Sequence, residues 1–456
     1  MRLSVQEIAQ AVHGKLLTKN PDQTTILEIT TDSRKMLTSG LFIPLKGERF
    51  DGHDFISQVY DKGAIATLTM HQAVVDERLV TIWVEDTQKA LLDLARFYRS
   101  QFKLPVIGVT GSVGKTSTKE MIAATLSGKW QVHKTQGNFN NEIGLPLTLF
   151  ELNEAHQVAV IEMGMNHFGE IHNLSMTAKP NVAVITNVGT SHIENLGSRE
   201  GILKAKLEIL DGLNANGLLV INGDNDLLGT LKEVGVSKVT YGLNDKNDYW
   251  AKNITQEGMY TMAEVITPHH HYKIKIKALG EHMVYNTLAA IAVAEYYKLS
   301  EAEILKGLSS YEPTKMRMQI SELENELTIM DDTYNASPDS MKAALKVLKD
   351  YASKGRKVAV LGDMFEMGDF APKLHKEVGE FASMIGIDLL VAVGNLAKYI
   401  ELGYEEAGSH QVYYFETKEA FIKEMKGILQ KEDCILFKAS RGMHFETLVE
   451  EVGKVK

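Results

Sequence analysis

The sequence has a single cysteine, few prolines and no long apolar run. One cysteine, Cys434, among 456 residues excludes an internal disulfide and a cysteine-based zinc cluster, and is typical of a reducing compartment. The 36 glycines and 9 prolines give no low-complexity signal. No apolar run approaches the roughly 20 residues of a membrane-spanning helix, and the amphipathic N-terminus lacks the apolar core of a signal peptide. We therefore expect a cytoplasmic protein without membrane insertion.

The chain also lacks an excess of positive charge. It carries 49 Lys and Arg against 59 Asp and Glu, a net charge of −10, which argues against a general affinity for nucleic acid or anionic membranes. Hydrophobic residues make up 44% and charged residues 24%, as in folded globular proteins, so a disordered or fibrous chain is excluded. At roughly 150 residues per domain, the length predicts about three domains.

Short apolar segments alternate with helical patterns along the whole chain. Up to about residue 100, short apolar runs between turn clusters predict a small α/β unit. Strand-like runs separated by helical patterns then follow at 104–110, 158–161, 182–185 and 217–221. This alternation predicts a mostly parallel sheet with helices on both faces. A third alternation begins near residue 312, so we expect three α/β domains at 1–100, 101–313 and 314–456.

One segment has a different pattern. Residues 272–277 alternate lysine with apolar residues, which predicts a half-exposed strand at a sheet edge. The three histidines before it, His269, His270 and His271, could suggest a metal site. No carboxylate or cysteine accompanies them at ligand spacing, so a hairpin turn is the favoured interpretation.

The strongest local signal is a glycine-rich turn between a buried strand and a helix. Gly111, Gly114, Lys115 and Thr116 lie in the segment Gly108-Val-Thr-Gly-Ser-Val-Gly-Lys-Thr-Ser117. Backbone N–H groups of such a turn approach phosphate oxygens, the lysine pairs with the β- and γ-phosphates, and the hydroxyl reaches Mg²⁺. The generic P-loop pattern requires a glycine where this chain has Val109. An ordinary strand-to-helix turn is the alternative, and phosphate binding is favoured over it.

Two polar residues follow strands of the same predicted sheet. Glu162 ends the strand at 158–161, and His192 follows the strand at 182–185. The carboxyl edge of an α/β sheet is where ligands bind, so both are candidate Mg²⁺-shell residues; a hydrogen-bonded loop histidine is the alternative for His192. Lys206 lies in a helical pattern beside Lys204, and the local sequence does not distinguish them.

Taken together, these motifs resemble the ATP-dependent Mur ligases of bacterial cell-wall synthesis. The P-loop form Thr110–Thr116 is the variant that this family uses, which explains the mismatch at Val109. Further matching segments, in the family's order, cover nearly the whole chain: Gly137–Pro146, Glu162–Gly164, Asn187–His192, Lys204–Ile209 and Gly280–Asn286. The resemblance implies a central P-loop domain with a parallel sheet and a C-terminal Rossmann-like α/β domain that closes on ATP. The family often has Asn where this chain has Met283.

The resemblance also implies cofactors and site residues. It implies ATP, two Mg²⁺ ions and a carbamate on Lys206, which it selects over Lys204; a carbamate would turn a cation into an anion able to bind the second Mg²⁺. The implied catalytic residues are Lys115, Glu162, His192 and Lys206. The implied metal-shell residues are Thr116, Glu162, His192 and Lys206. The implied nucleotide-binding residues are Gly111, Ser112, Val113, Gly114, Lys115, Thr116, Ser117, Asn286, Arg317 and Asp332.

Three C-terminal segments resemble the family member that joins D-alanyl-D-alanine to UDP-N-acetylmuramoyl-tripeptide: Asp331–Met341 (with Ser337 for Asn), Leu361–Gly368 and Lys438–Arg441 (with Ala439 for Gly). The N-terminal Thr31–Arg34 and Gly40–His53 resemble a UDP-sugar-binding domain. The Asp-Asn-Pro-Arg signature of the preceding, diaminopimelate-adding ligase is absent. The implied substrate-binding residues are Ser33, Arg34, Lys46, Asp51, His53, Asn138, Asn141, Asn335, Lys438, Ser440 and Arg441.

The resemblance thus implies a monomeric, ADP-forming acid–amino-acid ligase that works through an acyl phosphate, in the last cytoplasmic step of peptidoglycan precursor synthesis. Three alternatives stay open: a P-loop switch or motor, a folylpolyglutamate-synthase-like ligase, which lacks this N-terminal domain, and a sister ligase that adds a single amino acid. The sequence leaves open whether the third residue of the tripeptide is lysine or diaminopimelate.

Overall fold

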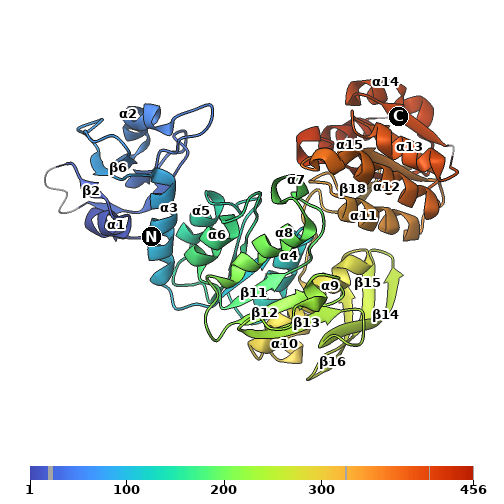
Figure 1. Cartoon of the computed structure of the whole chain (residues 1–456), viewed down its shortest axis with the longest axis horizontal. Helices are drawn as coiled ribbons and strands as arrows, with labels where there is room; N and C mark the ends of the chain where they lie inside the picture. The colour runs from blue at the N-terminus through green and yellow to red at the C-terminus, as the bar shows by residue number, and fades with distance from the viewer. Residues whose placement is uncertain (19–23, 324–325, 410, 455–456) are drawn as a thin grey trace. The chain divides into compact units, whose positions relative to one another are not determined.

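The computed structural model describes residues 1–18, 24–323, 326–409 and 411–454 (Figure 1). Contacts along the chain divide it into two compact units. Unit 1 contains Met1–Thr110, Trp130–Val184 and Lys206–Leu219; unit 2 contains Gly111–Lys129, Ile185–Ala205 and Val220–Lys456. The predicted α/β fold is confirmed, because helices and largely parallel strands alternate in both units.

The N-terminal part of unit 1 is a five-stranded sheet with the order β2-β7-β6-β5-β4. Only the β2–β7 pair is antiparallel. The sequence predicts helix from Leu3, but Leu3–Ser4 is a short strand and the Ser4 side chain caps a helix that begins at Val5. The elements are β1 (Leu3–Ser4), α1 (Val5–Ala11), β2 (Lys15–Leu16), β3 (Thr25–Ile26), β4 (Glu28–Thr30), β5 (Gly40–Phe42), η1 (Gly52–Phe55), α2 (Ile56–Val59), η2 (Tyr60–Lys62), β6 (Ala64–Thr69), β7 (Val80–Trp83) and α3 (Thr87–Ser100).

The remainder of unit 1 contains strands in the order β11-β8-β10-β9, in which β10 pairs in parallel with both β8 and β9. Every residue of β8 and β10 is buried, as expected for strands covered on both faces. Helix α3 packs on α5 and α6. The elements are β8 (Val106–Thr110), β9 (Val132–Lys134), α5 (Gly144–Phe150), β10 (Val158–Glu162), α6 (Glu170–Ala178), β11 (Val182–Ile185, ending in unit 2) and η3 (Glu208–Leu210).

Unit 2 begins with the helix that follows the glycine-rich turn and with strands in the order β16-β15-β14-β13-β12. β14, β15 and β16 are antiparallel neighbours, so this part of the sheet departs from the mostly parallel pattern predicted. The predicted edge strand is confirmed at β16, and residues 267–270 form the predicted hairpin turn before it. The elements are α4 (Lys115–Ser127), α7 (Ile193–Leu196), α8 (Arg199–Leu207, ending in unit 1), β12 (Leu218–Asn222, beginning in unit 1), η4 (Leu228–Thr230), β13 (Ser237–Gly242), β14 (Tyr249–Glu257), β15 (Tyr260–Ile266), β16 (His271–Ile276), α9 (Glu281–Tyr296) and α10 (Glu301–Ser309).

The C-terminal part of unit 2 is a six-stranded sheet with the order β17-β18-β22-β19-β20-β21, parallel except for its edge strand β17. Successive strand residues alternate between two apolar clusters, one with α11, α12 and α13 and the other with α14 and α15 (Figure 1). Each face of the sheet therefore has its own core. The elements are β17 (Gln319–Glu322), β18 (Thr328–Asp331), α11 (Pro338–Asp350), β19 (Lys357–Gly362), η5 (Gly368–Phe370), α12 (Ala371–Met384), β20 (Leu389–Val393), α13 (Lys398–Glu406), β21 (Val412–Phe415), α14 (Lys418–Ile428), β22 (Cys434–Lys438), η6 (Arg441–Met443) and α15 (Glu446–Val452).

No helix in the described part of the chain has both the length and the apolar character that a membrane span requires.

Candidate active site

The glycine-rich turn is held in shape by the segment that follows β11. The N–H groups of Ser112 and Val113 donate to the backbone oxygen (3.1 Å) and side-chain oxygen (2.8 Å) of Asn187. The Thr186 hydroxyl donates to the carbonyl of Val113 (2.5 Å). Gly111 has a φ of +155°, and a Cβ there would lie 1.8 Å from the Thr186 hydroxyl. The turn therefore needs glycine at 111 both for its backbone angle and for its close approach to Thr186.

Gly114 and Lys115 complete the turn. Gly114 has a left-handed φ of +83° and begins α4 without a side-chain cap, which leaves the helix N-terminus suited to an anion. The Lys115 ammonium donates to the carbonyl of Gly111 (2.8 Å), so it lies over the turn. Ser117, in the first turn of α4, is partly exposed. These are the features that phosphate binding requires.

Arg317 reaches the first turn of α4. Its Nη2 donates to the hydroxyl of Thr116 (3.1 Å), and its guanidinium stacks over the Tyr334 ring with the carbon 4.0 Å from the centroid. Stacking and hydrogen bonding fix the guanidinium plane. A second cation is thereby held beside the P-loop helix.

A cavity of about 640 Å³ in unit 2 brings predicted residues together. Seven of them line it: Val113, Gly114, Ser117, Asn286, Arg317, Asp332 and Lys438. Asn286 is buried and accepts a hydrogen bond from the Thr118 hydroxyl (2.9 Å), which fixes its amide. His282 also lines the cavity, and burial lowers its pKa. The cavity has a size typical of small-molecule sites.

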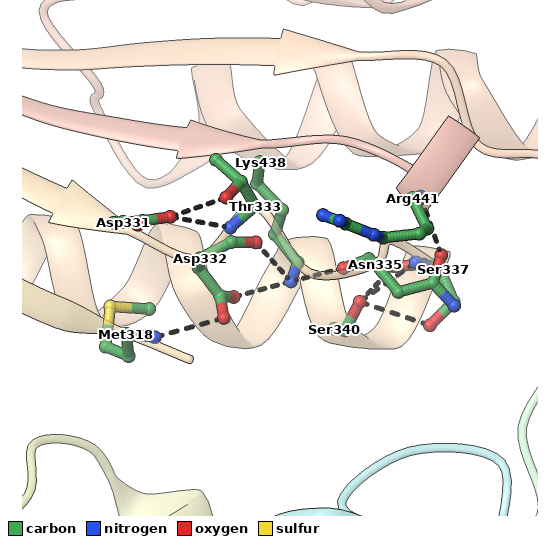
Figure 2. A network of polar contacts seen from close by, with 9 residues as sticks. All are labelled: Met318, Asp331, Asp332, Thr333, Asn335, Ser337, Ser340, Lys438 and Arg441. Atoms are coloured by element: carbon green, nitrogen blue, oxygen red, sulfur yellow. Dashed lines mark hydrogen bonds and ion pairs between the residues drawn. The ribbon is translucent and has the colours of Figure 1, made fainter. Parts of the chain in front are cut away.

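Asp332 and Lys438 lie at the centre of a polar network at the C-terminal edge of β18 and β22 (Figure 2). The buried Lys438 ammonium pairs with Asp332 and also donates to the carbonyl of Asn335 (2.9 Å). The other Asp332 oxygen accepts from the N–H of Met318 (3.1 Å). Burial lowers the pKa of Lys438, and Asp332 opposes this shift. Because both groups are shielded from water, removing either would leave the other's charge uncompensated.

The turn after β22 contacts two further segments. The side-chain oxygen of Asn335 accepts from the N–H of Arg441 (3.4 Å), and the Arg441 guanidinium pairs with Glu446 (3.1 Å). The buried Ser440 hydroxyl accepts from the N–H of Phe365 (2.8 Å). The predicted residues Asn335, Lys438, Ser440 and Arg441 are therefore adjacent, and Ala439 is accommodated in the turn.

The loop between β19 and α12 is anchored at several points. The N–H of Met364 donates to Nε2 of the fully buried His375 (2.8 Å), whose Nδ1 lies 2.7 Å from the carbonyl of Ala371. The buried Asp363 carboxylate accepts from the N–H groups of Leu396 (2.9 Å) and Ala397 (2.8 Å). These anchors give the loop, residues 363–368, a defined shape.

His192 lies near the tip of this loop. Its Nδ1 is 2.6 Å from the Glu366 carboxylate. Both residues have a φ of +63°, which is uncommon for residues other than glycine. Sequence reasoning did not single out Glu366, since 174 positions separate it from His192.

In unit 1, Glu162 ends β10 and is buried. One of its carboxylate oxygens accepts from the Asn140 amide (2.9 Å), and its N–H donates to the Thr135 hydroxyl (3.0 Å). Sequence reasoning assigned no role to Asn140; the signal was its place in the Asn-rich loop, residues 137–146, which contains Asn138, Asn140 and Asn141. Asn141 instead accepts from the N–H groups of Ile143 and Gly144 (3.2 and 2.8 Å) and so caps α5. Asn138 is an exposed loop residue.

The two lysines of α8 differ in their exposure to solvent. Lys206 is 1% exposed, whereas Lys204 is exposed. Of the two side chains, Lys206 therefore lies in the protein interior and Lys204 in solvent. The structure therefore provides the distinction that the local sequence lacks.

The N-terminal predicted residues form two clusters in unit 1. Arg34 makes three hydrogen bonds to the Asp32 carboxylate, each 2.9 Å, which lower the pKa of Asp32 to about 2; the Arg34 side chain is itself exposed. The Ser33 carbonyl accepts from Lys62 (2.8 Å). This turn borders a surface pocket of about 410 Å³ that Phe50 also lines. A polar turn and an exposed aromatic ring therefore lie side by side at this pocket.

The second cluster contains Asp51 and His53. His53 is buried, and its Nε2 accepts from the N–H of Met70 (3.1 Å), so the proton lies on Nδ1 and is donated to Asp51 (2.6 Å). The hydrogen bonds that Asp51 accepts from the His53 N–H (3.0 Å) and from the His53 side chain lower the pKa of Asp51. Lys46 pairs with Asp51 through the backbone.

Two of the four residues predicted for magnesium carry the ligand atoms that this ion prefers. Thr116 and Glu162 offer oxygen donors, the kind that Mg²⁺ prefers, and Mg²⁺ at phosphate sites is usually held by one or two carboxylates plus phosphate oxygens and water. Across the ranges that the structure describes, no group of three or more His, Cys, Asp or Glu side chains is arranged to hold a metal ion. A site that includes nucleotide phosphates does not require such a group.

Burial of histidines predicts a loss of stability in acid. Burial lowers the pKa of His133 and His375, whereas in the unfolded chain both titrate near 6.5. The unfolded state therefore binds protons first as the pH falls, so stability is full above about 6.5 and decreases below it. We expect the thermal midpoint to fall between pH 7.5 and 5.5. His133→Gln should reduce the slope of the free energy of unfolding against pH by up to about 1.4 kcal/mol per pH unit. His444→Gln, at an exposed position, should leave this slope unchanged. Equal slopes in all three proteins would contradict this.

Comparisons with known proteins agree with the geometry. Family models match residues 25–99 (Mur ligase family, catalytic domain), 109–294 (Mur ligase middle domain) and 316–441 (Mur ligase, glutamate ligase domain). The chain is 42% identical to the UDP-N-acetylmuramoyl-tripeptide–D-alanyl-D-alanine ligase of Bacillus subtilis over 99% of this chain and 98% of that protein.

Solved structures agree as well. A crystal structure of MurF from Acinetobacter baumannii superposes with a TM-score of 0.92 at 33% identity, covering 100% of this chain and 99% of that one. MurF ligase from Thermotoga maritima in complex with ADP gives a TM-score of 0.84 at 30% identity, covering 94% and 97%. The resemblance inferred from the motifs is confirmed, and the chain belongs to the Mur ligase family.

Proposed function

We propose that this chain is an ATP-dependent ligase that joins D-alanyl-D-alanine to UDP-N-acetylmuramoyl-tripeptide in peptidoglycan precursor synthesis. ATP is converted to ADP and phosphate as one amide bond forms. The observation that carries the proposal is the 42% identity to the Bacillus subtilis ligase along 99% of the chain, which includes the segments 331–341, 363–368 and 438–441. A ligase that uses intracellular ATP and nucleotide-linked substrates acts in the cytoplasm, and we propose that it does so as a monomer.

The first step activates the acceptor acid, because a carboxylate and an amine otherwise form only a salt. A carboxylate oxygen of the tripeptide attacks the γ-phosphorus of ATP, and the bond between that phosphorus and the β-phosphate oxygen breaks. The products of this step are ADP and an acyl phosphate on the tripeptide. The N–H groups of the 111–114 turn and the N-terminus of α4 hold the phosphates, while Lys115 and Arg317 offset the charge on the transferring group. This arrangement is supported by the contacts of both cations at the turn.

Magnesium, when bound, neutralises phosphate charge and orients the reacting oxygens. We propose Thr116 and Glu162 for one ion, and His192 and a carbamate on Lys206 for a second. The hydrogen bond from Asn140 restricts the Glu162 carboxylate to one orientation. The burial of Lys206 supports its choice over Lys204.

The second step forms the amide. The neutral amine of D-alanyl-D-alanine attacks the acyl carbon, the carbon–oxygen bond to phosphate breaks, and the nitrogen loses a proton. We propose that Asn335, Lys438, Ser440 and Arg441 form the part of the site that receives the dipeptide. Arg441 offers a half-exposed guanidinium suited to its carboxylate. Asp332 would contact the ribose of ATP, and Asn286 the adenine.

We further propose three domains with the bounds 1–100, 101–313 and 314–456. The ranges of the three family models support this division. The first domain would bind the UDP portion of the substrate through Ser33, Arg34, Lys46, Asp51 and His53. The Asn-rich loop would contact the tripeptide through Asn138 and Asn141.

The test is ADP release with purified protein, Mg·ATP, UDP-N-acetylmuramoyl-tripeptide and a panel of amines. We expect release with D-alanyl-D-alanine and none with D-alanine, L-alanine or no amine. Release with single amino acids instead would identify a sister ligase, and amine-independent hydrolysis would identify a switch; either result would overturn the proposal. A comparison of ADP release between tripeptides that end in lysine and tripeptides that end in diaminopimelate measures which third residue the enzyme prefers.

A further inference from the structure

The Glu366 carboxylate is presented to His192 by a rigid loop. Residues 363–368 connect β19 to α12, and the N–H groups of Met364 and Phe365 are both held by side chains from other segments, His375 and Ser440. The Ser440 N–H in turn donates to the carbonyl of Asp363 (3.0 Å). The backbone on the N-terminal side of Glu366 is therefore anchored by groups that are themselves buried.

The loop tip has an unfavourable backbone conformation. Glu366 has a φ of +63°, and so does His192, the residue that it meets. Left-handed φ values at residues other than glycine persist only where the surroundings impose them, and they concentrate at functional sites. Here both of them bring one pair of side chains together, with Oε2 of Glu366 2.6 Å from Nδ1 of His192.

The burial of the pair is unequal. The His192 side chain is 18% exposed and the Glu366 side chain 49% exposed. The imidazole is thus largely shielded from water, whereas the carboxylate stays partly hydrated. The contact is close but lacks hydrogen-bond geometry, because Nδ1 of His192 has no hydrogen-bond partner among the described residues; Glu366 therefore acts on the imidazole through contact and charge.

A carboxylate in contact with one ring nitrogen of an imidazole occupies the space beside it and leaves the other ring nitrogen available. Histidines that bind metals almost always have such a partner on the other nitrogen, and loss of the partner weakens metal affinity. With Nδ1 facing Glu366, Nε2 is the ring nitrogen available for a ligand.

From these contacts we infer that Glu366 is a positioning residue: it fixes the His192 imidazole for metal binding, from a loop far along the chain. The inference rests on the proposed function only in taking His192 as a metal-shell residue. It adds a role for the 363–368 loop, because that loop supplies a partner to His192 in addition to its contact with Ser440.

The test is binding of Mn²⁺, a spectroscopic probe for Mg²⁺, measured from the electron paramagnetic resonance signal of free Mn²⁺ with a non-hydrolysable ATP analogue present. We expect Glu366→Ala to weaken the binding of one Mn²⁺ by roughly 10- to 100-fold. Glu366→Gln should give an intermediate loss, since it keeps the shape and removes the charge. Glu405→Ala, at an exposed position of α13, is the control and should bind as the unmodified protein does.

A double-variant cycle with His192→Ala tests whether the two residues act together. We expect Glu366→Ala to add no further loss of Mn²⁺ affinity in the His192→Ala background. An unchanged Mn²⁺ affinity in Glu366→Ala, or independent losses from the two substitutions, would overturn the inference. Mn²⁺ binding needs no turnover, so it tests the inference independently of catalysis. The proposed function is tested separately, by ADP release from the unmodified protein with the panel of amines.

Discussion

Replacing Lys206 by alanine is expected to lower kcat for ligation by about a hundred- to a thousandfold, the scale seen when a group that stabilises transition-state charge is lost. Lys206 is 1% exposed on α8, so its side chain is committed to the protein interior. If it carries a carbamate, the substitution removes an anion from beside the acceptor carboxylate and with it one metal position. ADP release with D-alanyl-D-alanine measures the loss.

Three measurements separate this role from a structural one. Short-chain carboxylates such as formate and acetate should partly restore activity to Lys206→Ala, because they supply the missing anion. Lys204→Ala, two positions away and exposed, should retain full activity. With ¹³C-labelled bicarbonate, a carbamate resonance should appear in the unmodified protein and in Lys204→Ala but not in Lys206→Ala. Full activity of Lys206→Ala would remove this lysine from the site.

The Gly111→Ala substitution is expected to remove most of the affinity for ATP. A Cβ at 111 would lie 1.8 Å from the Thr186 hydroxyl, so Thr186 must move and its hydrogen bond to the Val113 carbonyl must break. The backbone must also leave its φ of +155°. Overpacking of this kind costs up to about 3 kcal/mol, which corresponds to about a hundredfold in affinity. Calorimetric titration with a non-hydrolysable ATP analogue measures the change.

Gly427→Ala is the matched control for this prediction. Gly427 lies in α14, and a Cβ there meets no atom within 4 Å, so alanine should raise helix stability slightly and leave ATP binding unchanged. Thr186→Ala in the Gly111→Ala background removes the clashing hydroxyl and should restore part of the affinity. Tight ATP binding by Gly111→Ala alone would show that the turn can adjust without glycine.

Local sequence patterns predicted the parts of the site that are contiguous in the chain. The P-loop, the carboxylate at the end of β10 and the edge strand β16 each follow from residues within about ten positions of one another. Their physics is local: backbone angles, strand periodicity and the position of a residue at a strand end. The α/β alternation was predicted for the same reason.

Other features depend on tertiary structure and were beyond the reach of local patterns. Lys204 and Lys206 differ in burial, which the two-residue spacing alone does not specify. The contact of Asn140 with Glu162 and that of Glu366 with His192 join residues that are far apart in sequence. The antiparallel strands β14–β16 were also not predicted as such, because strand direction depends on the connections between strands and leaves little trace in composition.

The lysines of β16 have a consequence for how the protein behaves at high concentration. β16 is the last strand of its sheet, and Lys273 and Lys275 project from its exposed face. An unpaired strand edge is a template on which a second copy could add its own strand, the first step of aggregation. Two such edges meeting would bring these ammonium groups against each other. The positive charge of this strand therefore protects the chain from edge-to-edge self-association, a role separate from ligation.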